Sequence, residues 1–162
     1  MITLTNLTAG PEIGANYYLL DIEGSRIVLD CGMHPKQDGN AAKPNFSLIG
    51  AADPDALFIT HSHLDHIGTR PVLHDEYPRA EVIMTVGTAE VGDAMLHNSV
   101  NVMTAKRMGE GIIEYPFFTH GELQRHVNAW VTRPYNEPFR TGNNGTILAT
   151  LHDAGHILGS CG

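Results

Sequence analysis

Three histidines and one aspartate lie within six positions of the segment THSHLDHIG. His61, His63, Asp65 and His66 follow directly after an apolar run, and each of these side chains can bind a metal ion. Imidazole and carboxylate ligands together suit zinc, and they also suit manganese or iron. The order His-x-His-x-Asp-His therefore predicts a metal-binding loop at the end of a buried strand.

The spacing of these four side chains indicates how they divide between ions. In an extended segment, side chains two residues apart point the same way, so His61 and His63 can converge on one ion. Asp65 and His66, beyond the turn, can face a second ion. Gly68 lets the backbone turn tightly near the ions. We expect two neighbouring metal sites that share one loop.

A second histidine-containing segment, TLHDAGHILGS, offers a further ligand. It also follows an apolar strand pattern and ends in glycine and serine. We expect His156 to join His61 and His63, which gives three protein ligands and an open position for water, the arrangement of catalytic zinc sites. His152 is an additional candidate in the same segment. The remaining histidines are interpreted as surface or core residues: His34, His74, His97, His120 and His126.

Strands and helices must position these ligands. Apolar patterns predict five strands, over 15–22, 25–32, 55–60, 80–86 and the first part of 144–155. Helical spacing predicts three helices, a short one within 67–78 and longer ones over 87–108 and 119–131. Glu23-Gly24 is typical of a hairpin turn, and the glycine, proline and asparagine content of 34–50 predicts a loop. Thr119 and Glu122 form a capping-box pattern at the start of the last helix.

Strands come first in the chain and then alternate with helices, which predicts an α/β or α+β fold. Residues 1–162 contain no internal repeat, low-complexity tract or linker, so we expect a single domain. A mixed sheet flanked by helices is the expected architecture.

The formal net charge of −8 limits how this chain could contact nucleic acid. A domain that binds phosphates by itself usually carries a basic patch. Lys106-Arg107 is the only adjacent basic pair in the sequence. An RNA-directed activity therefore needs a local basic cleft, or basic residues from another segment.

Cysteine content and hydropathy predict a cytoplasmic protein. Cys31 and Cys161 are too few for a disulfide framework and fit a reducing cytosol. No apolar run is long enough to span a bilayer, so we expect no membrane partner. The N-terminal segment MITLTNLTAG lacks the basic and apolar pattern of a secretory signal.

THSHLDHIG resembles the signature of the metallo-β-lactamase fold, and DAGHILGS resembles the third motif of its β-CASP branch. That branch includes ribonuclease J, the cleavage and polyadenylation endonuclease and related RNA-processing exonucleases. IVLDCG is similar to the first motif of the family. The segments AMLHNSVNVM, FFTHGELQRHVNAW and RPYNEPFRTGNNGTILATLHDAGH follow the order and spacing of the branch. The resemblance covers nearly the whole chain.

The resemblance implies the N-terminal part of an αββα sandwich that hydrolyses phosphodiester bonds in RNA, with DNA as the other candidate substrate. It also implies zinc, one or two ions per complete site, with manganese as an alternative metal. Asp65 and His66 would be catalytic residues at the second ion, and Asp65 would orient the attacking water. Asp30 takes the position of the family's aspartate that supports the histidine loop without binding metal.

The later ligands of the family have no counterpart in residues 1–162. A bridging aspartate, a last histidine and the β-CASP insert follow the motif of His156 in the family. We therefore expect a fragment of a longer protein with little or no nuclease activity by itself, because the second ion has only Asp65 and His66. Such a fragment would expose apolar sheet surface and an unpaired edge, so we expect a homo-oligomer or strand exchange between chains.

Two other functions fit the same residues. A different hydrolase on this fold, such as a thioesterase or lactonase, would use the same histidine loop. DAGHILGS and AMLHNSVNVM favour the nucleic-acid branch over that alternative. A non-catalytic metal-binding or interaction module is the second alternative, and the incomplete ligand set favours it for this chain taken alone. Exonuclease and endonuclease action are equally compatible with these residues.

Overall fold

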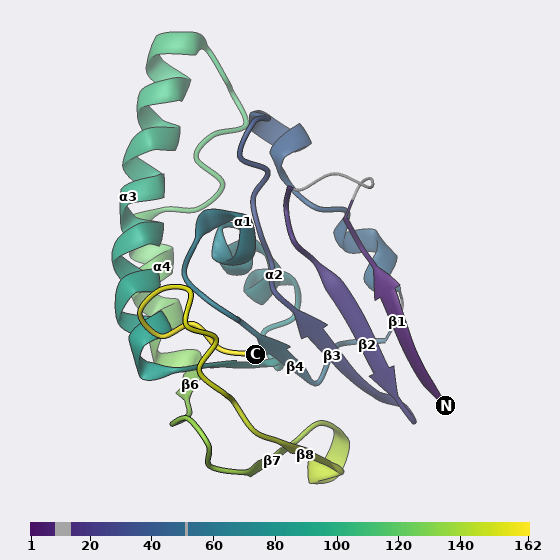
Figure 1. Ribbon diagram of the computed structural model, residues 1–162. Coiled ribbons are helices and arrows are strands. Elements are labelled where there is room, and N and C mark those ends of the chain that lie inside the picture. The colour runs from purple at the N-terminus through teal and green to yellow at the C-terminus, as the bar shows by residue number, and fades with distance from the viewer. Residues whose placement is uncertain (9–13, 51) are drawn as a thin grey trace.

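Residues 1–8, 14–50 and 52–162 are described by the computed structural model, and Figure 1 shows their arrangement. The strands are β1 Ile2–Asn6, β2 Tyr18–Ile22, β3 Ser25–Leu29, β4 Ala56–Phe58, β5 Glu81–Met84, β6 Trp130–Thr132, β7 Phe139–Thr141 and β8 Ile147–Ala149. The helices are α1 Leu64–Ile67, α2 Arg70–Glu76, α3 Val86–Glu110 and α4 His120–His126. Short 3₁₀ helices lie at Gly39–Ala42, Phe46–Ile49, Val127–Ala129 and Asn143–Gly145.

Six strands form one mixed sheet in the order β1-β2-β3-β4-β5-β6. The first three strands pair antiparallel, and β3 to β6 pair parallel. Glu23 and Gly24 join β2 to β3 with φ angles of 52° and 91°, the left-handed conformation that suits a two-residue hairpin turn. Parallel strands need crossover connections: the loop with two 3₁₀ helices joins β3 to β4, α1 and α2 lie between β4 and β5, and α3 and α4 lie between β5 and β6. The mixed sheet with its helices confirms the predicted α/β class.

One face of the sheet packs against the helices and forms the core. Register places one buried apolar residue of each strand from β2 to β6 side by side: Leu19, Val28, Leu57, Val82 and Trp130. The helices add apolar side chains to the same cluster: Ile67, Leu73, Leu96, Val100, Met103 and Leu123. Because α1 and α3 both contribute to this core, the loops at their ends are held in fixed positions.

The opposite face of the sheet is covered in part by the hairpin of β7 and β8. Phe58 in β4 stacks on Phe139 in β7, with ring centroids 6.1 Å apart and 21° between the ring planes. Leu4 in β1 is 64% exposed, and Leu20 and Leu29 on the same face are only partly buried. This face therefore keeps apolar surface open to solvent in the described part of the chain.

The predicted helix over 119–131 is wrong in its last turn. α4 ends at His126, and Trp130–Thr132 forms β6, which pairs with β5. Strand pairing and the packing of Trp130 against the core outweigh the helical spacing of this segment. The capping box predicted at the start of α4 is present.

The other predicted elements are present with shifted ends. The predicted strand over 55–60 is limited to β4, and the helix expected within 67–78 is α2, preceded by the one-turn α1. The predicted loop over 34–50 contains two of the 3₁₀ helices. None of the described helices is long and apolar enough to cross a membrane.

Backbone hydrogen bonds hold α1 against the β2–β3 hairpin. The carbonyl groups of Leu64, Asp65 and His66 accept bonds from N–H groups at the two ends of that hairpin, at 2.7–2.8 Å. The bonds to Asp65 and His66 satisfy carbonyl groups that a helix end leaves without partners, and the Leu64 carbonyl also accepts from the Gly68 N–H at 2.8 Å. A Cβ atom on Gly32 would lie 1.8 Å from the Asp65 carbonyl oxygen, so this close approach requires glycine.

We expect Gly32→Ala to lower the free energy of unfolding by about 2 kcal/mol or more, because the added methyl group forces two backbone segments apart. Urea unfolding measures the change. Gly109→Ala in α3 is the matched control, since nothing lies within 4 Å of its added Cβ. That control should gain about 0.5–1 kcal/mol. Equal stability of Gly32→Ala and the unchanged chain would contradict the close approach.

We expect chains of residues 1–162 to associate through β1, because all five of its residues are exposed and one of its edges is unpaired in the described structure. Leu4→Lys should shift the population towards monomer, since it places a charge on the exposed apolar face. Sedimentation velocity at increasing concentration measures this. A clean monomer at high concentration would contradict the prediction.

Candidate metal centre

The loop between β4 and α1 presents the four residues singled out in the sequence. His61 is 8% exposed and lies just after the buried end of β4. His63 is the N-cap residue of α1, with extended backbone angles of φ −65° and ψ 144°. Asp65 and His66 were expected beyond a turn, and they lie within the helical turn of α1 itself. The loop therefore changes from extended to helical at His63.

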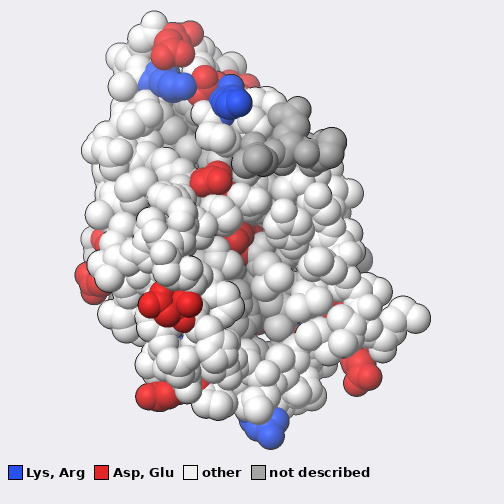
Figure 2. Space-filling view, in the orientation of Figure 1, with Lys and Arg blue, Asp and Glu red and all other residues white. Residues whose placement is uncertain are grey.

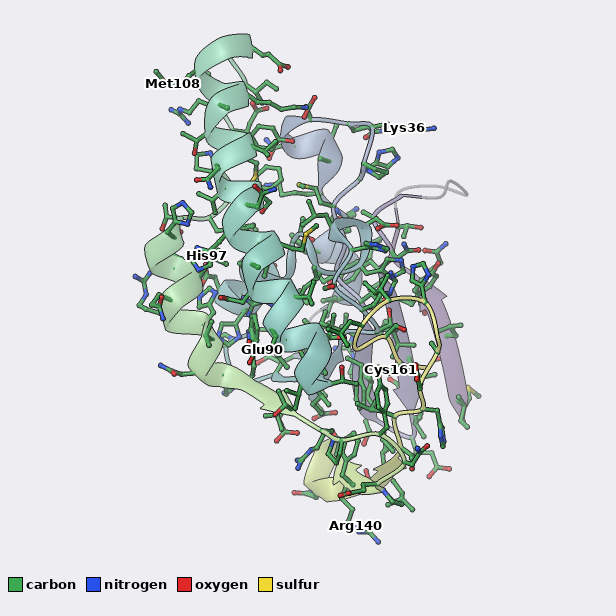
Figure 3. All side chains as sticks on the ribbon, turned by 60° about the vertical axis from the view of Figure 1, so that its left-hand side comes forward. Lys36, Glu90, His97, Met108, Arg140 and Cys161 are labelled. Carbon is green, nitrogen blue, oxygen red and sulfur yellow. The ribbon has the colours of Figure 1, made fainter. Side chains whose placement is uncertain are left out.

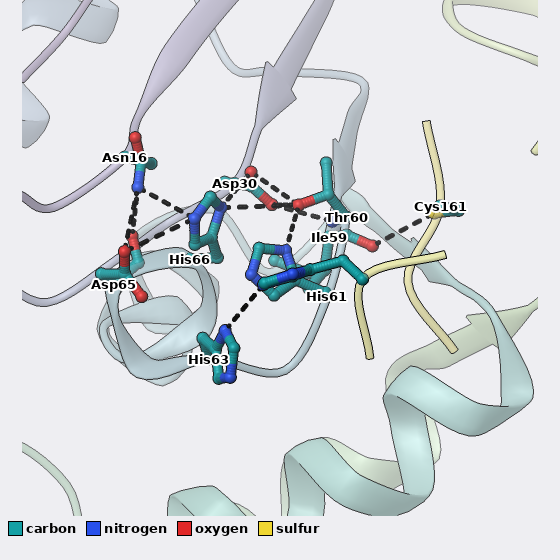
Figure 4. A network of polar contacts seen from close by, with 10 residues as sticks. Asn16, Asp30, Ile59, Thr60, His61, His63, Asp65, His66 and Cys161 are labelled. Atoms are coloured by element: carbon teal, nitrogen blue, oxygen red, sulfur yellow. Dashed lines mark hydrogen bonds and ion pairs between the residues drawn. The ribbon is translucent and has the colours of Figure 1, made fainter. Parts of the chain in front are cut away.

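The buried carboxylate of Asp30 joins this loop to β3 (Figure 4). It accepts hydrogen bonds from the Thr60 N–H at 2.8 Å, from the Thr60 hydroxyl at 2.9 Å and from Nδ1 of His66 at 2.8 Å. Because a carboxylate only accepts, His66 carries its proton on Nδ1 and keeps a lone pair on Nε2. That tautomer is the one a metal ligand needs. These contacts place Asp30 beside the histidine loop, and its supporting role stays a prediction.

His61 is held in the same tautomer by a longer chain of hydrogen bonds. Its Nδ1 lies 2.9 Å from the hydroxyl oxygen of Thr60, whose own proton goes to Asp30. The hydroxyl therefore accepts from Nδ1–H of His61, and Nε2 keeps the lone pair. Burial, followed by the nearby rings of His66, His63 and His156, lowers the pKa of His61 to about 4. The ring is thus neutral at physiological pH.

The structure brings His61, His63 and His156 together. One nitrogen of each ring lies within 4.8 Å of the others, and Nε2 of His156 is 3.3 Å from Nδ1 of His63. Nitrogen ligands of one zinc ion lie about 3.4 Å apart, because each bond is about 2.0–2.1 Å long. The three imidazoles therefore fit a zinc ion with small side-chain adjustments. The described residues hold no second cluster of three such ligands.

The loop that carries His156 is tied to the rest of the site at several points. The Ser160 hydroxyl oxygen accepts from the backbone N–H of His156 at 3.0 Å. The Gly159 carbonyl accepts from the hydroxyl groups of Thr85 and Thr88, at 2.6 and 2.8 Å, at the first turn of α3. Figure 3 shows this loop, with Cys161 labelled, beside that end of α3. A distant part of the chain thus places its histidine opposite the first loop.

Asp65 and His66 lie next to the three histidines. Oδ2 of Asp65 lies 3.5 Å from Nε2 of His66, and the ring centroids of His66 and His61 are 3.9 Å apart. Burial acts to lower the pKa of His66, but the hydrogen bond and charge of Asp30, together with Asp65, leave it above the ordinary value. The two groups of candidate ligands are therefore neighbours, and their division between two ions stays a prediction.

His152 is not brought to the three-histidine cluster, since its Nδ1 lies 2.8 Å from Oδ1 of Asn136. Four of the other histidines form two pairs of contacting rings: His74 meets His126 edge to face, with ring centroids 4.6 Å apart, and His97 stacks on His120, with ring centroids 4.9 Å apart. Nε2 of His126 also lies 2.9 Å from the carboxylate of Asp75. These contacts are those of packing residues, in line with the interpretation from sequence.

Two residues at the site were not predicted from the sequence. Thr60 links Asp30 to His61, and the side-chain amide of Asn16 lies between Asp65 and His66. Thr60 directly precedes the histidine motif, and Asn16 is a polar residue at the start of an apolar strand pattern. Neither feature indicates a role at the site until the fold brings these segments together.

Comparison with known proteins finds relatives of similar sequence. The Drosophila melanogaster protein named "Cleavage and polyadenylation specificity factor 73" is 29% identical over 161 residues, which cover 99% of this chain and 22% of that protein. The Neurospora crassa protein named "Endoribonuclease ysh-1" is 31% identical over 156 residues, which cover 96% of this chain and 18% of that protein. The chain thus spans about a fifth of the length of these curated relatives.

Solved structures share the fold at low sequence identity. An archaeal metallo-beta-lactamase superfamily protein from Sulfolobus tokodaii is 22% identical with a TM-score of 0.54, covering 94% of this chain and 55% of that one. A B3 metallo-beta-lactamase is 19% identical with a TM-score of 0.55, covering 92% of this chain and 50% of that one. The family model of the metallo-beta-lactamase superfamily matches residues 10–128. The chain therefore belongs to the metallo-beta-lactamase superfamily.

Proposed function

We propose that His61, His63 and His156 bind one zinc ion and that Asp65 and His66 bind a second. The convergence of the three imidazoles carries this proposal, because neutral nitrogen ligands at this spacing suit zinc. Manganese is the alternative metal, since it accepts imidazole and carboxylate ligands as well. A bound zinc ion supplies an activated water, whose pKa falls to about 7.

The residues of the chain prepare this site before metal arrives. Asp30 and Thr60 fix the protons of His66 and His61 on Nδ1, so that both Nε2 atoms keep lone pairs. The lowered pKa of His61 keeps this ring from competing for a proton above about pH 4. The Asp65 carboxylate is 30% exposed and can accept a hydrogen bond from the attacking water.

We propose further that the full-length protein hydrolyses phosphodiester bonds in RNA. The names of the relatives support this substrate, and so does the motif DAGHILGS. A cavity of about 370 Å³ opens beside His63 and Asp65, and Lys106 lines it. On the face shown in Figure 2, lysine and arginine side chains are few and form no continuous patch. Lys106 is the lysine of this cavity, and its Nζ is paired with the Asp38 carboxylate at 2.7 Å, so a phosphate that reaches it would compete with that pair.

The tests below distinguish this function from two alternative functions. A thioesterase or lactonase could use the same histidine loop, and a non-catalytic metal-binding module needs only the three-histidine cluster.

The cytoplasm is the proposed compartment, which the two free and buried cysteines support.

We expect purified 1–162 loaded with zinc to retain about one tightly bound ion per chain after gel filtration, held by the three histidines. His156→Ala should lose that ion, because only two of the three ligands remain. Elemental analysis of zinc per chain measures both. His152→Ala is the matched control, since this histidine contacts Asn136 instead of the cluster, and it should retain the ion. Retention of a full equivalent by His156→Ala would rule out the three-histidine site.

We expect the metal-loaded full-length protein to cleave an RNA oligonucleotide and His63→Ala to lose about a hundredfold or more of that rate, as loss of a metal contact typically does. The isolated 1–162 should show no steady turnover, because its described residues offer the second ion few ligands. Gel electrophoresis of a labelled oligonucleotide measures cleavage, with thioester and lactone hydrolysis assayed in parallel.

The outcomes of that experiment separate the three functions. Hydrolysis of a thioester or lactone without RNA cleavage would favour the other hydrolases of the fold. Zinc binding with no hydrolysis of any of these substrates would favour the non-catalytic module. Steady RNA turnover by 1–162 alone would show that the chain completes a site without further segments.

A further inference from the structure

The side-chain amide of Asn16 lies against Asp65 and His66, the two residues proposed to bind the second ion. These two residues alone give that ion few ligands. Its Nδ2 is 3.0 Å from Nε2 of His66, 3.4 Å from Oδ2 of Asp65 and 3.1 Å from the backbone oxygen of Asp65. Figure 4 shows these contacts on the side of His66 opposite to Asp30. Asn16 thus meets the very atoms that would face a metal ion.

The identity of the amide atom follows from its neighbours. The carboxylate and the backbone carbonyl of Asp65 can only accept hydrogen bonds, so the atom facing them is the amide nitrogen. Because this amide nitrogen can only donate, Nε2 of His66, 3.0 Å away, accepts a hydrogen bond from it. In the metal-free chain, a donor group therefore occupies the lone pairs that a cation would use.

Three side-chain atoms form a triangle with the dimensions of a metal site. Nδ2 of Asn16, Oδ2 of Asp65 and Nε2 of His66 are separated by 3.4, 3.0 and 3.5 Å. Ligands on one face of a tetrahedral zinc site are about 3.4 Å apart. A half-turn of the amide about its last side-chain bond would replace Nδ2 with Oδ1 at the same corner.

We propose that Asn16 is a third donor of the second ion, through Oδ1, alongside Asp65 and His66. The inference rests on the proposed metal centre and adds a ligand to it. In the metal-free chain the nitrogen faces inwards, because an amide oxygen would meet the oxygens of Asp65 without a proton between them. A divalent cation reverses that preference, since all three groups then present lone pairs to one positive charge.

The backbone of Asn16 keeps its side chain in place in both states. Its N–H donates to the Asp65 carbonyl at 2.8 Å, and its own carbonyl accepts from the Gly32 N–H at 3.0 Å. Substitution of the side chain leaves these backbone bonds unchanged. Variants at this position therefore test the amide and preserve the support of α1.

The test is a calorimetric titration of 1–162 with zinc chloride. We expect two binding events, a tight one at the three histidines and a weaker one at the second site. Asn16→Ala should weaken the second event about tenfold or more and leave the first unchanged, because it removes one of three donors. Asn16→Asp should strengthen the second event, since a carboxylate presents an oxygen in either orientation.

Asn101→Ala is the matched control, because the Asn101 amide also contacts a histidine, His120 at 3.1 Å, but lies on α3 away from the site. It should change neither event. If Asn16→Ala bound the second zinc ion as tightly as the unchanged chain, or more tightly, the proposal would be overturned. Asn16 would then compete with the ion or have no part in binding it. A single event in the unchanged chain, or a weaker second event in Asn16→Asp, would also overturn it.

The two proposals fail in different ways. Loss of the RNA-cleaving activity would leave the zinc titration and its Asn16 dependence intact. Thermal unfolding of each variant without zinc checks the fold, and the first binding event is an internal check on the three-histidine cluster. If Asn16→Ala failed to fold, the direction of change in Asn16→Asp would still decide the question.

Discussion

The candidate metal centre depends on one buried carboxylate, that of Asp30. Its two oxygens meet Thr60 and His66, and through Thr60 they reach His61. Asp30 has a φ of 58°, a left-handed conformation that costs about 1–3 kcal/mol at a residue other than glycine. Its backbone N–H nevertheless donates to the Phe58 carbonyl at 2.8 Å, which ties β3 to the end of β4. Asp30 keeps this left-handed conformation because strand pairing fixes its backbone and the hydrogen bonds of the carboxylate fix its side chain.

A second constraint joins segments that are far apart in the sequence. His156 reaches the site because α3, β4 and the last described loop meet at one place. Gly159 has a φ of 86°, and a Cβ atom there would lie 2.1 Å from the Thr88 backbone nitrogen, so only glycine permits this contact. The Cys161 N–H donates to the Thr60 carbonyl at 2.8 Å, directly before the first histidine of the cluster. The position of one ligand is therefore coupled to the backbone that carries the others.

Local sequence indicates which histidines can converge better than it indicates where the elements end. Histidine spacing and the motifs THSHLDHIG and DAGHILGS predict the cluster of His61, His63 and His156, because residues that can bind a metal are few in type and stand here in a tight pattern. The sequence predicts a helix at Trp130, because helical spacing continues through this segment. The pairing of Trp130 with β5, which makes it a strand residue, is visible only in the folded structure. Asn16 and Thr60 could not be found in this way. Their roles come from contacts across 49 or 50 and 30 positions of the chain, which no local pattern records.

The two groups of ligands differ in charge, and this difference bears on how they would share the chemistry. Three neutral imidazoles add no negative charge, so an ion held by His61, His63 and His156 would keep its full positive charge towards a water molecule. The second group contains the Asp65 carboxylate, which offsets part of the charge of its ion and weakens its pull on the same water. An amide donor from Asn16 would add an oxygen to that group without adding charge. Under the proposed function, the first group would therefore be the better activator of water, and the second would be the better site for holding and orienting an oxygen of the substrate.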